Sequence, residues 1–467
     1  MIKLQPREDL ELPGRLAASA DRTTGVHLSM EGFADWMRER AKAHEFRIER
    51  IGFTALRGWG FARDSGNLVH ESGKFFSVEG LRWRRPADGA AVHYQPIINQ
   101  PEVGILGILA KEFDGVPHFL MQAKVEPGNP RPLMLSPTVQ ATRSNYTQVH
   151  KGAQVKYLEY FVGPRRGRVI TDVLLSEHGD WFYRKRNRNM IVEVDEPVPL
   201  DDDFCWLTLG QINELMSVDN MINMDSRTVL ACLPQAAPGL ASDGFRGALA
   251  ASRAPDAGAM STTAQLLSWF TGMRSDCEIE AARMPLYDLP GWHRGEDEIG
   301  RVDGRFFKVV AVDVRAEGRE VAAWTQPLIE PSGRGLCAFL VRELGGVLHL
   351  LVHARAEGGF LDGVELGPTV QCMAHTQIED EPPLFLDQIP PAGSPRIRYQ
   401  AVHAEEGGRF LNAECDYLIV EADDRLADPP PADYTWVTVG QLTELLRHGQ
   451  YANVQARTLI ACLNSIR

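Results

Sequence analysis

The sequence predicts an α+β fold that is built twice in tandem. The first observation is a long internal repeat: residues 206–233 and 436–463 are identical at 12 of 28 positions, at an offset of 230 residues. A shorter match lies upstream, where SGKFFSVEG at 72–80 pairs with DGRFFKVVA at 303–311. The other two observations are hairpin patterns in the middle of each copy and helix signals at its ends. Together they indicate one fold of strands and helices, duplicated.

Two β-hairpins are expected in each copy. Residues 103–127 form two apolar runs around Asp114-Gly115, a dipeptide that favours two-residue turns, and residues 335–357 repeat the pattern around a Gly-Gly pair. A second hairpin is expected over 169–187, and its counterpart over 397–414, again with glycine at the turn. Antiparallel or mixed sheet therefore dominates the middle of each copy.

Helices are expected at both ends of each copy. An opening helix is predicted around Trp36 in the first copy and around Trp269 in the second. Near the end of each copy, Thr208 precedes Gln211, and Thr438 precedes Gln441, with the spacing of a capping box ahead of a helical apolar pattern. Residues 234–263 are rich in Ala, Gly, Ser and Pro, which predicts a linker between a first repeat at 1–233 and a second at 264–467.

Composition and charge exclude several classes of protein. The 467 residues carry a formal net charge of −13, which disfavours nucleic acid and anionic membranes as partners. Seven cysteines without a Cys-x-x-Cys pair argue against a disulfide framework or a thiolate zinc site. No signal peptide or apolar run long enough to span a membrane is found, so a cytoplasmic location is expected.

Polar side chains on the predicted central strands are the first candidates for a site. Gln122 and Lys124 fall on one face of a strand, and His353 and Arg355 occupy the equivalent positions of the second copy. They either line the floor of a pocket for an anionic, oxygen-rich ligand or lie on a solvated sheet face. His349 and His353 are about 13 Å apart along a strand, too far to share a metal ion.

Three further patterns have both a functional and a structural interpretation. Trp59 and Trp292 each follow a glycine at matching positions, and could stack on a ligand or anchor the core. TRSNY at 142–146 offers groups that suit a diphosphate or a pyrimidine, whereas its counterpart at 373–377 lacks them. The basic runs at 165–168 and 184–188 are interpreted as a solvated strand face.

The motifs FFSVEGLRW, MLSPTVQATRSNYTQVHKG, YLEYF and the second-copy GPTVQC resemble those of the NDP-hexose 2,3-dehydratase family over nearly the whole chain. The resemblance implies two tandem Nudix-like modules, each with flanking helices, and a homodimer. It also implies dTDP-4-keto-6-deoxyglucose as substrate, in deoxysugar biosynthesis for antibiotics, with an NADPH-dependent 3-ketoreductase acting on the product. The Nudix box itself is absent from this sequence, and the implied reaction needs no cofactor.

The implied reaction is an elimination. The 4-keto group acidifies the proton on carbon 3, a base removes it to give an enolate, and hydroxide leaves from carbon 2 with help from an acid. The enol product tautomerises to a 3,4-diketo-2,6-dideoxy sugar. Such a site needs a base with a pKa near neutral and groups that stabilise the enolate oxygen.

Site residues follow from the resemblance and from the strand faces, and the first copy is expected to be the active one. Catalytic candidates are Lys124, Glu159, Tyr160 and Tyr94, with base and acid unassigned. Substrate-binding candidates in the first copy are Trp59, Gln95, Gln122, Thr142, Arg143, Ser144, Asn145 and Tyr146. Those in the second copy are Trp292, His353, Arg355 and Gln371.

Two other classes of function remain open at this stage. A Nudix-type pyrophosphohydrolase would need carboxylates on one helix to hold magnesium, a pattern that neither copy has. A catalytically silent nucleotide-sugar binding protein is expected to lose its motif in both copies, whereas the first-copy TRSNY motif is complete.

Overall fold

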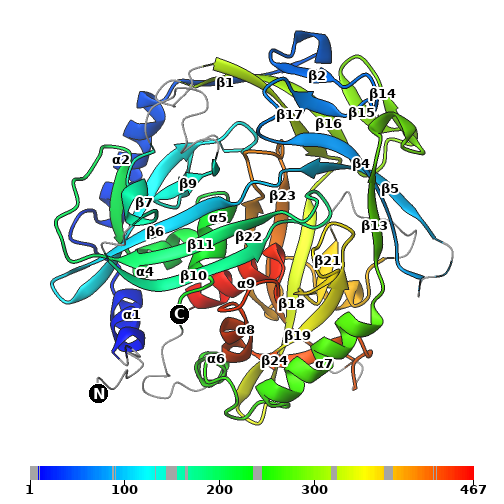
Figure 1. The fold of residues 1–467 in the computed structure, drawn as a ribbon. Coiled ribbons are helices and arrows are strands. Elements are labelled where there is room, and N and C mark those ends of the chain that lie inside the picture. Colours follow the sequence, from blue (N-terminus) through cyan, green and yellow to red (C-terminus); the bar gives the residue numbers. More distant parts are fainter. Residues whose placement is uncertain are drawn as a thin grey trace, which may run out of the picture.

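A computed structural model describes residues 9, 11–86, 89, 91–131, 133–143, 155–163, 167–234, 244–316, 323–372, 382–423, 425–426 and 429–466. The predicted α+β class is confirmed, and the chain consists of two similar halves (Figure 1). The helices of the first half are α1 (Leu12–Asp21), α2 (Met30–Ala43), α4 (Leu209–Met216) and α5 (Met224–Leu230). Their counterparts are α6 (Phe245–Ala251), α7 (Thr263–Asp276), α8 (Val439–Leu445) and α9 (Val454–Ser465).

Within the described residues, each half contains a seven-stranded mixed sheet. In the first half it has the order β10-β11-β6-β7-β12, with β8 on β7 and β9 on β6. In the second it contains β18–β24, and β23 runs parallel to β18 as β11 does to β6. The first-half bounds are β6 (Gly104–Phe113), β7 (Val116–Val125), β8 (Leu133–Ser136), β9 (Val139–Ala141), β10 (Arg168–Ser176), β11 (Arg186–Glu193) and β12 (Phe204–Thr208). The second-half bounds are β18 (Gly335–Leu344), β19 (Val347–Ala356), β20 (Val364–Gly367), β21 (Val370–Cys372), β22 (Ile397–Ala404), β23 (Glu414–Glu421) and β24 (Tyr434–Thr438).

Two smaller sheets, each five-stranded in the described part of the chain, join the halves by exchanging strands (Figure 1). First-half β1 pairs with second-half β16, and second-half β13 pairs with first-half β4. One sheet contains β1 (Phe46–Ile51), β14 (Trp292–Arg294), β15 (Glu298–Arg301), β16 (Phe307–Ala316) and β17 (Ala323–Pro331). The other contains β2 (Trp59–Phe61), β3 (Leu68–His70), β4 (Ser77–Arg84), β5 (His93–Asn99) and β13 (Glu280–Met284). Neither half therefore completes its small sheet alone.

The local predictions are confirmed. The β6–β7 hairpin turns at Asp114-Gly115, where both residues have positive φ (51° and 78°), as a two-residue turn of this type requires. The hairpins β10–β11, β18–β19 and β22–β23 also form. Both capping boxes are present, at the start of α4 and of α8. The segment predicted as a linker includes α6, which contacts β19 as α1 contacts β7.

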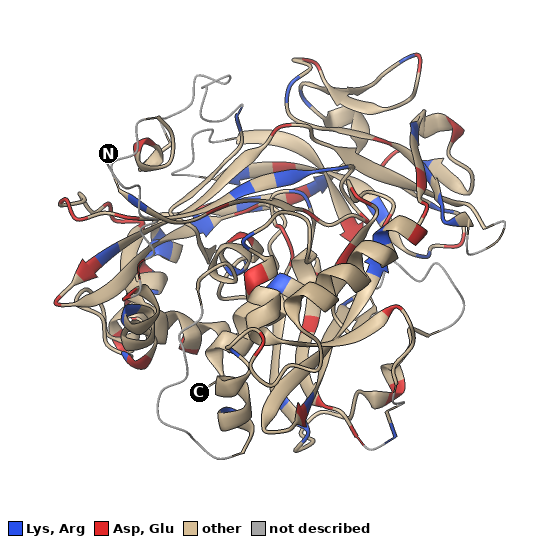
Figure 2. Ribbon diagram, turned by 60° about the horizontal axis from the view of Figure 1, so that its bottom comes forward, with Lys and Arg blue, Asp and Glu red and all other residues tan. Residues whose placement is uncertain are grey.

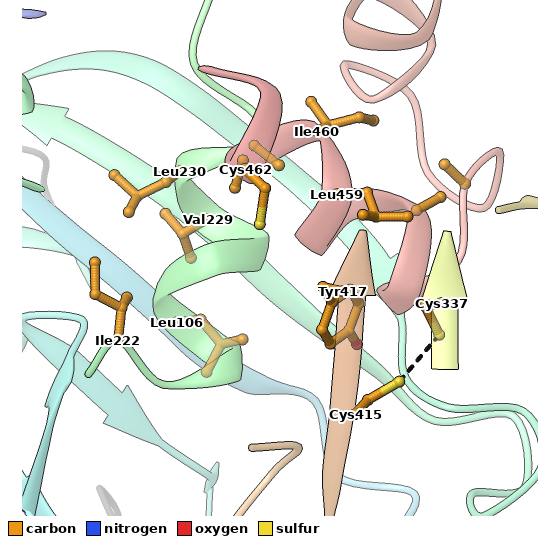
Figure 3. Close-up of a cluster of buried hydrophobic side chains, with 14 of the residues drawn as sticks. Leu106, Ile222, Val229, Leu230, Cys337, Cys415, Tyr417, Leu459, Ile460 and Cys462 are labelled. Carbon is orange, nitrogen blue, oxygen red and sulfur yellow. Dashed lines mark hydrogen bonds between the residues drawn. The ribbon is translucent and has the colours of Figure 1, made fainter. Parts of the chain in front are cut away.

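Helices α5 and α9 pack together where the two halves meet (Figure 3). Val229 and Leu230 of α5, and Leu459 and Ile460 of α9, are buried side chains of the core around these helices. Beside this contact, Cys415 Sγ donates a hydrogen bond to Cys337 Sγ (3.3 Å), and both cysteines are free of disulfides.

Two fully buried arginines tie the same helices to the opposite half. Arg227 donates to Ala404 O (2.7 Å) and to Thr458 Oγ1 (3.4 Å). Its counterpart Arg457 donates to Ser176 O (2.5 Å) and to Thr228 Oγ1 (2.5 Å). Figure 2 shows charged residues interspersed over both halves, including central strands. No helix in the described ranges is long and apolar enough to cross a membrane.

Candidate active site

A hydrogen-bonded network lies at the end of β7 in the first half. The Nε2 of Gln140 donates to Glu126 Oε1 (2.7 Å), and the Nδ2 of Asn223 donates to Gln140 Oε1 (3.2 Å). The ammonium of Lys124 donates to the backbone oxygen of Gln140 (3.3 Å). Asn223 also caps α5 through Ser226 N, so the helix start fixes one end of the network.

The second half repeats this network with an arginine in place of the lysine. Arg355 Nε donates to Glu357 Oε1 (2.9 Å), and Gln371 Nε2 donates to the same oxygen (3.0 Å). Asn453, the cap of α9, donates to Gln371 Oε1 (2.8 Å). The duplication has therefore kept a cation, a Glu, a Gln and an Asn together twice.

Each network faces a loop that comes from the opposite half. The loop at 405–413, between β22 and β23, contacts the first-half network: Gly128 N donates to Gly407 O (2.7 Å), and Asn412 N donates to Gly128 O (2.7 Å). A Cβ at Gly128 would lie only 1.7 Å from Phe410 O, so glycine is required for this approach. We call Lys124, Glu126, Gln140, Asn223, Asp225, Glu177, Lys185, Glu406 and Arg409 the first cluster.

The loop at 177–185, between β10 and β11, contacts the second-half network in the same way. Arg184 N donates to Gly359 O (2.7 Å), and Asp180 lies 3.8 Å from the guanidinium of Arg355. We call Arg355, Glu357, Gln371, Asn453, Glu365 and Asp180 the second cluster. Both clusters are composite, because each combines a sheet from one half with a loop from the other.

Burial and crowding of like charges shift the pKa values in the first cluster. Burial raises the pKa of Glu406 to about 7, with Glu177 and Glu126 adding to the shift and Arg409 opposing it. The pKa of Asp225 is raised well above its usual value, by burial and by the same acidic neighbours. Burial lowers the pKa of Lys185 to about 8. Lys185 is only 5% exposed, so the interpretation of 184–188 as a solvated face is wrong at this residue.

The second cluster also holds carboxyl groups that titrate near neutral pH. Burial, followed by the charge of Glu357, raises the pKa of Asp180 to about 8. Burial raises that of Glu365 to about 7, although Ser176 Oγ donates to its carboxylate (2.6 Å). Groups with pKa values in this range can both take up and release protons at physiological pH.

Several predicted site residues meet in these clusters. Lys124 lies in the first, Arg355 and Gln371 lie in the second, and Gln122 lies on β7 two residues before Lys124. His353 stacks on Tyr434 with ring centroids 4.3 Å apart, its Nε2 lies 3.0 Å from Asp433, and burial lowers its pKa. His349 pairs instead with backbone groups of 260 and 347, so the two imidazoles have separate partners.

The two tryptophans have different surroundings. Trp292 is buried, donates from its indole nitrogen to Tyr94 O (2.8 Å) and packs on Phe307. Trp59 remains partly exposed and packs on Phe76, which lies under the guanidinium of Arg409 at 4.4 Å. Trp59 is therefore linked to the first cluster through these two side chains.

Other candidates lie elsewhere. Gln95 donates to the backbone oxygen of Asp180, which places β5, including Tyr94, beside the second cluster. Tyr160 belongs to a short 3-10 turn, Leu158–Tyr160, and is buried in the apolar layer on one face of the first sheet, with the exposed Glu159 before it. Thr142 and Arg143 follow β9 directly, and Ser144, Asn145 and Tyr146 lie outside the described residues.

Sequence reasoning missed Glu126, Glu177, Asp225, Glu406, Arg409 and Asp180. A signal existed for the first, since Glu126 and Glu357 occur two residues after the matched cations Lys124 and Arg355. Glu406 and Asp180 gave no such signal, because they reach the clusters from a loop of the other half.

Comparison with known proteins adds a second line of observation. The family model for NDP-hexose 2,3-dehydratase matches residues 30–233 and 263–463. The chain belongs to the NDP-hexose 2,3-dehydratase family. Both the resemblance and the predicted hydro-lyase class are thereby confirmed, and one matched region falls in each half of this family member.

Two relatives are similar to the chain over nearly its whole length. A protein of Amycolatopsis orientalis, named dTDP-4-dehydro-6-deoxy-alpha-D-glucopyranose 2,3-dehydratase, is 53% identical over 474 positions, covering 100% of this chain and 96% of the relative. A protein of Saccharopolyspora spinosa with the same name is 49% identical, covering 93% of this chain and 91% of the relative.

Proposed function

We propose that this family member removes water from dTDP-4-keto-6-deoxyglucose to give a dTDP-3,4-diketo-2,6-dideoxy sugar. The observation that carries the proposal is the similarity to the two relatives named 2,3-dehydratases, which are 49–53% identical to this chain over nearly the full length. The structure supports it with buried clusters in which carboxyl groups and cations lie together. An elimination beside a ketone uses such groups to move a proton and to stabilise an enolate.

We place the reaction in the first cluster. Lys124 contributes a cation that can stabilise the enolate oxygen on carbon 4, and the neighbouring carboxyl groups supply the proton transfers. Thr142 and Arg143, which follow β9, extend from Gln140 toward the segment that the family resemblance assigns to the nucleotide. Tyr94, Glu159 and Tyr160 remain candidates of lower rank, because the observed contact to the network is that of Lys124.

The finer features are also part of the proposal. Residues 1–233 and 264–467 correspond to two Nudix-like modules joined through 234–263, which includes α6, and the two modules work as one unit because each cluster needs both. The protein acts as a cytoplasmic homodimer in antibiotic deoxysugar biosynthesis, and a 3-ketoreductase consumes its product. The 51.9 kDa chain should elute at about twice that mass in light scattering if it is a dimer.

The test is a coupled assay in EDTA. Purified protein receives dTDP-4-keto-6-deoxyglucose together with an NADPH-dependent 3-ketoreductase, which traps the unstable diketo product, and NADPH loss is followed. Continued turnover in EDTA supports the dehydratase and excludes a magnesium-dependent pyrophosphohydrolase. Binding of the substrate without any NADPH loss would instead identify a silent binding protein.

A further inference from the structure

The loop at 405–413 brings second-half side chains into the first cluster. Glu406 is half-buried there, and the charged groups that face it are Glu126, Glu177, Asp225, Lys185 and Arg409. None of the described residues donates a hydrogen bond to the Glu406 carboxyl group. The pKa of this carboxyl group is about 7, and no donor in the described part of the chain competes with a ligand for it.

The position of this loop is set by rigid contacts. Ile329 N donates to Arg409 O (2.9 Å), and Gln326 Nε2 donates to Gly408 O (2.9 Å). The guanidinium of Arg409 lies over Phe76, and its Nε donates to Gln100 Oε1 (3.3 Å). Contacts to both halves thus fix the segment that directly follows Glu406.

One carboxylate oxygen of Glu177, in the same cluster, is buried without an observed hydrogen-bond partner in the described part of the chain. Glu177 is 3% exposed, and its Oε1 accepts a hydrogen bond from Asn187 Nδ2 (2.7 Å). Its Oε2 is buried and has no hydrogen-bond partner among the described residues. A buried carboxylate oxygen left in this way is expected to meet a donor when the site is in use, such as a sugar hydroxyl or a protonated neighbour.

The two loops are not interchangeable. The residue equivalent to Glu406 in the first-half loop is His178, whose Nε2 is already bound to Glu405 at 2.8 Å. The residue equivalent to Asp180 is Gly408. Glu406 and Asp180 therefore reach the opposite half from different positions of their loops.

We propose that Glu406 is the base that removes the carbon-3 proton, so that the second half supplies a catalytic residue to the site of the first. This inference rests on the proposed function and names the group that starts the reaction. The Glu406 carboxylate takes the proton from carbon 3, and the bonding electrons form the enolate at carbons 3 and 4. The enolate then re-forms the ketone and expels hydroxide from carbon 2. The hydroxide takes the proton from Glu406 and leaves as water, which restores the carboxylate.

The pH dependence has a definite sign. A base must be ionised, and the pKa of Glu406 is about 7 in this cluster. The value of kcat should therefore rise as pH increases through about 7 and then level off. Arg409→Met removes the cation that opposes the shift, and should move the rise in kcat to higher pH without abolishing turnover.

The decisive experiment follows deuterium exchange at carbon 3 together with turnover. In D2O, substrate recovered from Glu406→Gln should no longer carry deuterium at carbon 3, and the kcat of this variant should fall by a factor of about 100 or more. Glu414→Gln is the matched control: it neutralises a carboxylate of the same hairpin that pairs with Arg334 at 3.2 Å and lies outside both clusters. Glu406→Asp keeps the carboxyl group and should recover part of both signals.

Three outcomes are distinguishable. Exchange at the wild-type rate in Glu406→Gln would overturn the inference while leaving the dehydratase intact. Loss of exchange in Asp180→Asn but not in Glu406→Gln would also overturn it, because it would place the base in the second cluster. If the wild-type protein yields no trapped product, the proposed dehydratase function is wrong, and the inference about Glu406 is wrong with it. Circular dichroism and binding of dTDP to Glu406→Gln show whether that variant is folded.

Discussion

The two clusters share a scaffold and differ in the charges placed on it. Both have a Glu, a Gln and a helix-capping Asn in one hydrogen-bonded chain. The positions that differ are the surrounding ones: Asp225 corresponds to Gln455 in the second half, and Lys185 to Ala413. The first cluster is therefore richer in charged groups of both signs.

This difference shows which parts of a duplicated site can change independently. The capping Asn and its partners are fixed by the start of α5 or α9, so altering them would cost the helix its cap. Loop residues such as Glu406 and Asp180 do not cap a helix, so the residue types at these positions can differ between the two copies. The shared scaffold maintains the fold, while the loops of the opposite half adjust the chemistry.

The largest expected effect concerns the matched tryptophans. Trp292→Ala should cost about 3–5 kcal/mol of unfolding free energy, because it removes a buried ring and a hydrogen bond to Tyr94 O. Trp59→Ala should cost far less stability, and should raise KM if the ring contacts the nucleotide. Urea unfolding and steady-state kinetics on both variants separate these effects. Equal stability losses would show that the two environments do not differ as described.

The next comparison is between the cations of the two clusters. Lys124→Met should lower kcat/KM by about 100-fold, equivalent to about 2.7 kcal/mol, since it removes the cation proposed to stabilise the enolate. Arg355→Met, its counterpart, should lower kcat/KM by less than about 10-fold if the second cluster does not turn over. The trapping assay measures both. A larger loss in Arg355→Met would move catalysis to the second cluster.

The features predicted correctly from the sequence are those that depend on residues close together in the chain. Turn dipeptides and capping boxes act within a few residues, which is why the hairpins and helix starts were predicted correctly. The crossing of β1 and β13 to the opposite half depends on which sheet edges are open in the folded chain, and no short-range pattern encodes that. Lys185 illustrates the same limit, because a basic run gives no sign of which member will be covered by another loop.

A pH-dependent effect on stability tests the raised pKa of Asp180. A carboxyl group whose pKa is raised from 3.8 to about 8 contributes stability that is complete below pH 4 and is lost as pH rises through about 8. Asn does not titrate, so Asp180→Asn should gain stability relative to wild type between pH 5 and pH 9. We expect about 4 kcal/mol between pH 5 and pH 8, since one pKa unit corresponds to about 1.4 kcal/mol and the carboxyl group of the unfolded chain is already ionised over this range.

Urea unfolding at pH 5, 7 and 9 measures this gain. Asp35→Asn, at an exposed position of α2, is the control and should show no such trend. A stability difference between Asp180→Asn and wild type that stays constant with pH would show that Asp180 is ionised throughout the range, and that the second cluster lacks a group titrating near neutrality.

The smallest expected effect concerns the two capping boxes, where the halves should behave alike. Thr208→Ala and Thr438→Ala each remove a buried hydroxyl that caps a helix. Each hydroxyl accepts a hydrogen bond from the backbone N–H three residues later. Each also donates to a backbone oxygen far upstream, that of Arg22 for Thr208 and that of Pro255 for Thr438. Each substitution should lower the unfolding free energy by about 1 kcal/mol. Because the strand exchange joins both halves into one cooperative unit, the two variants should unfold in a single transition and lose the same amount. A separate transition in one of them would mean that its half unfolds alone, which the paired strands β1–β16 and β4–β13 should prevent.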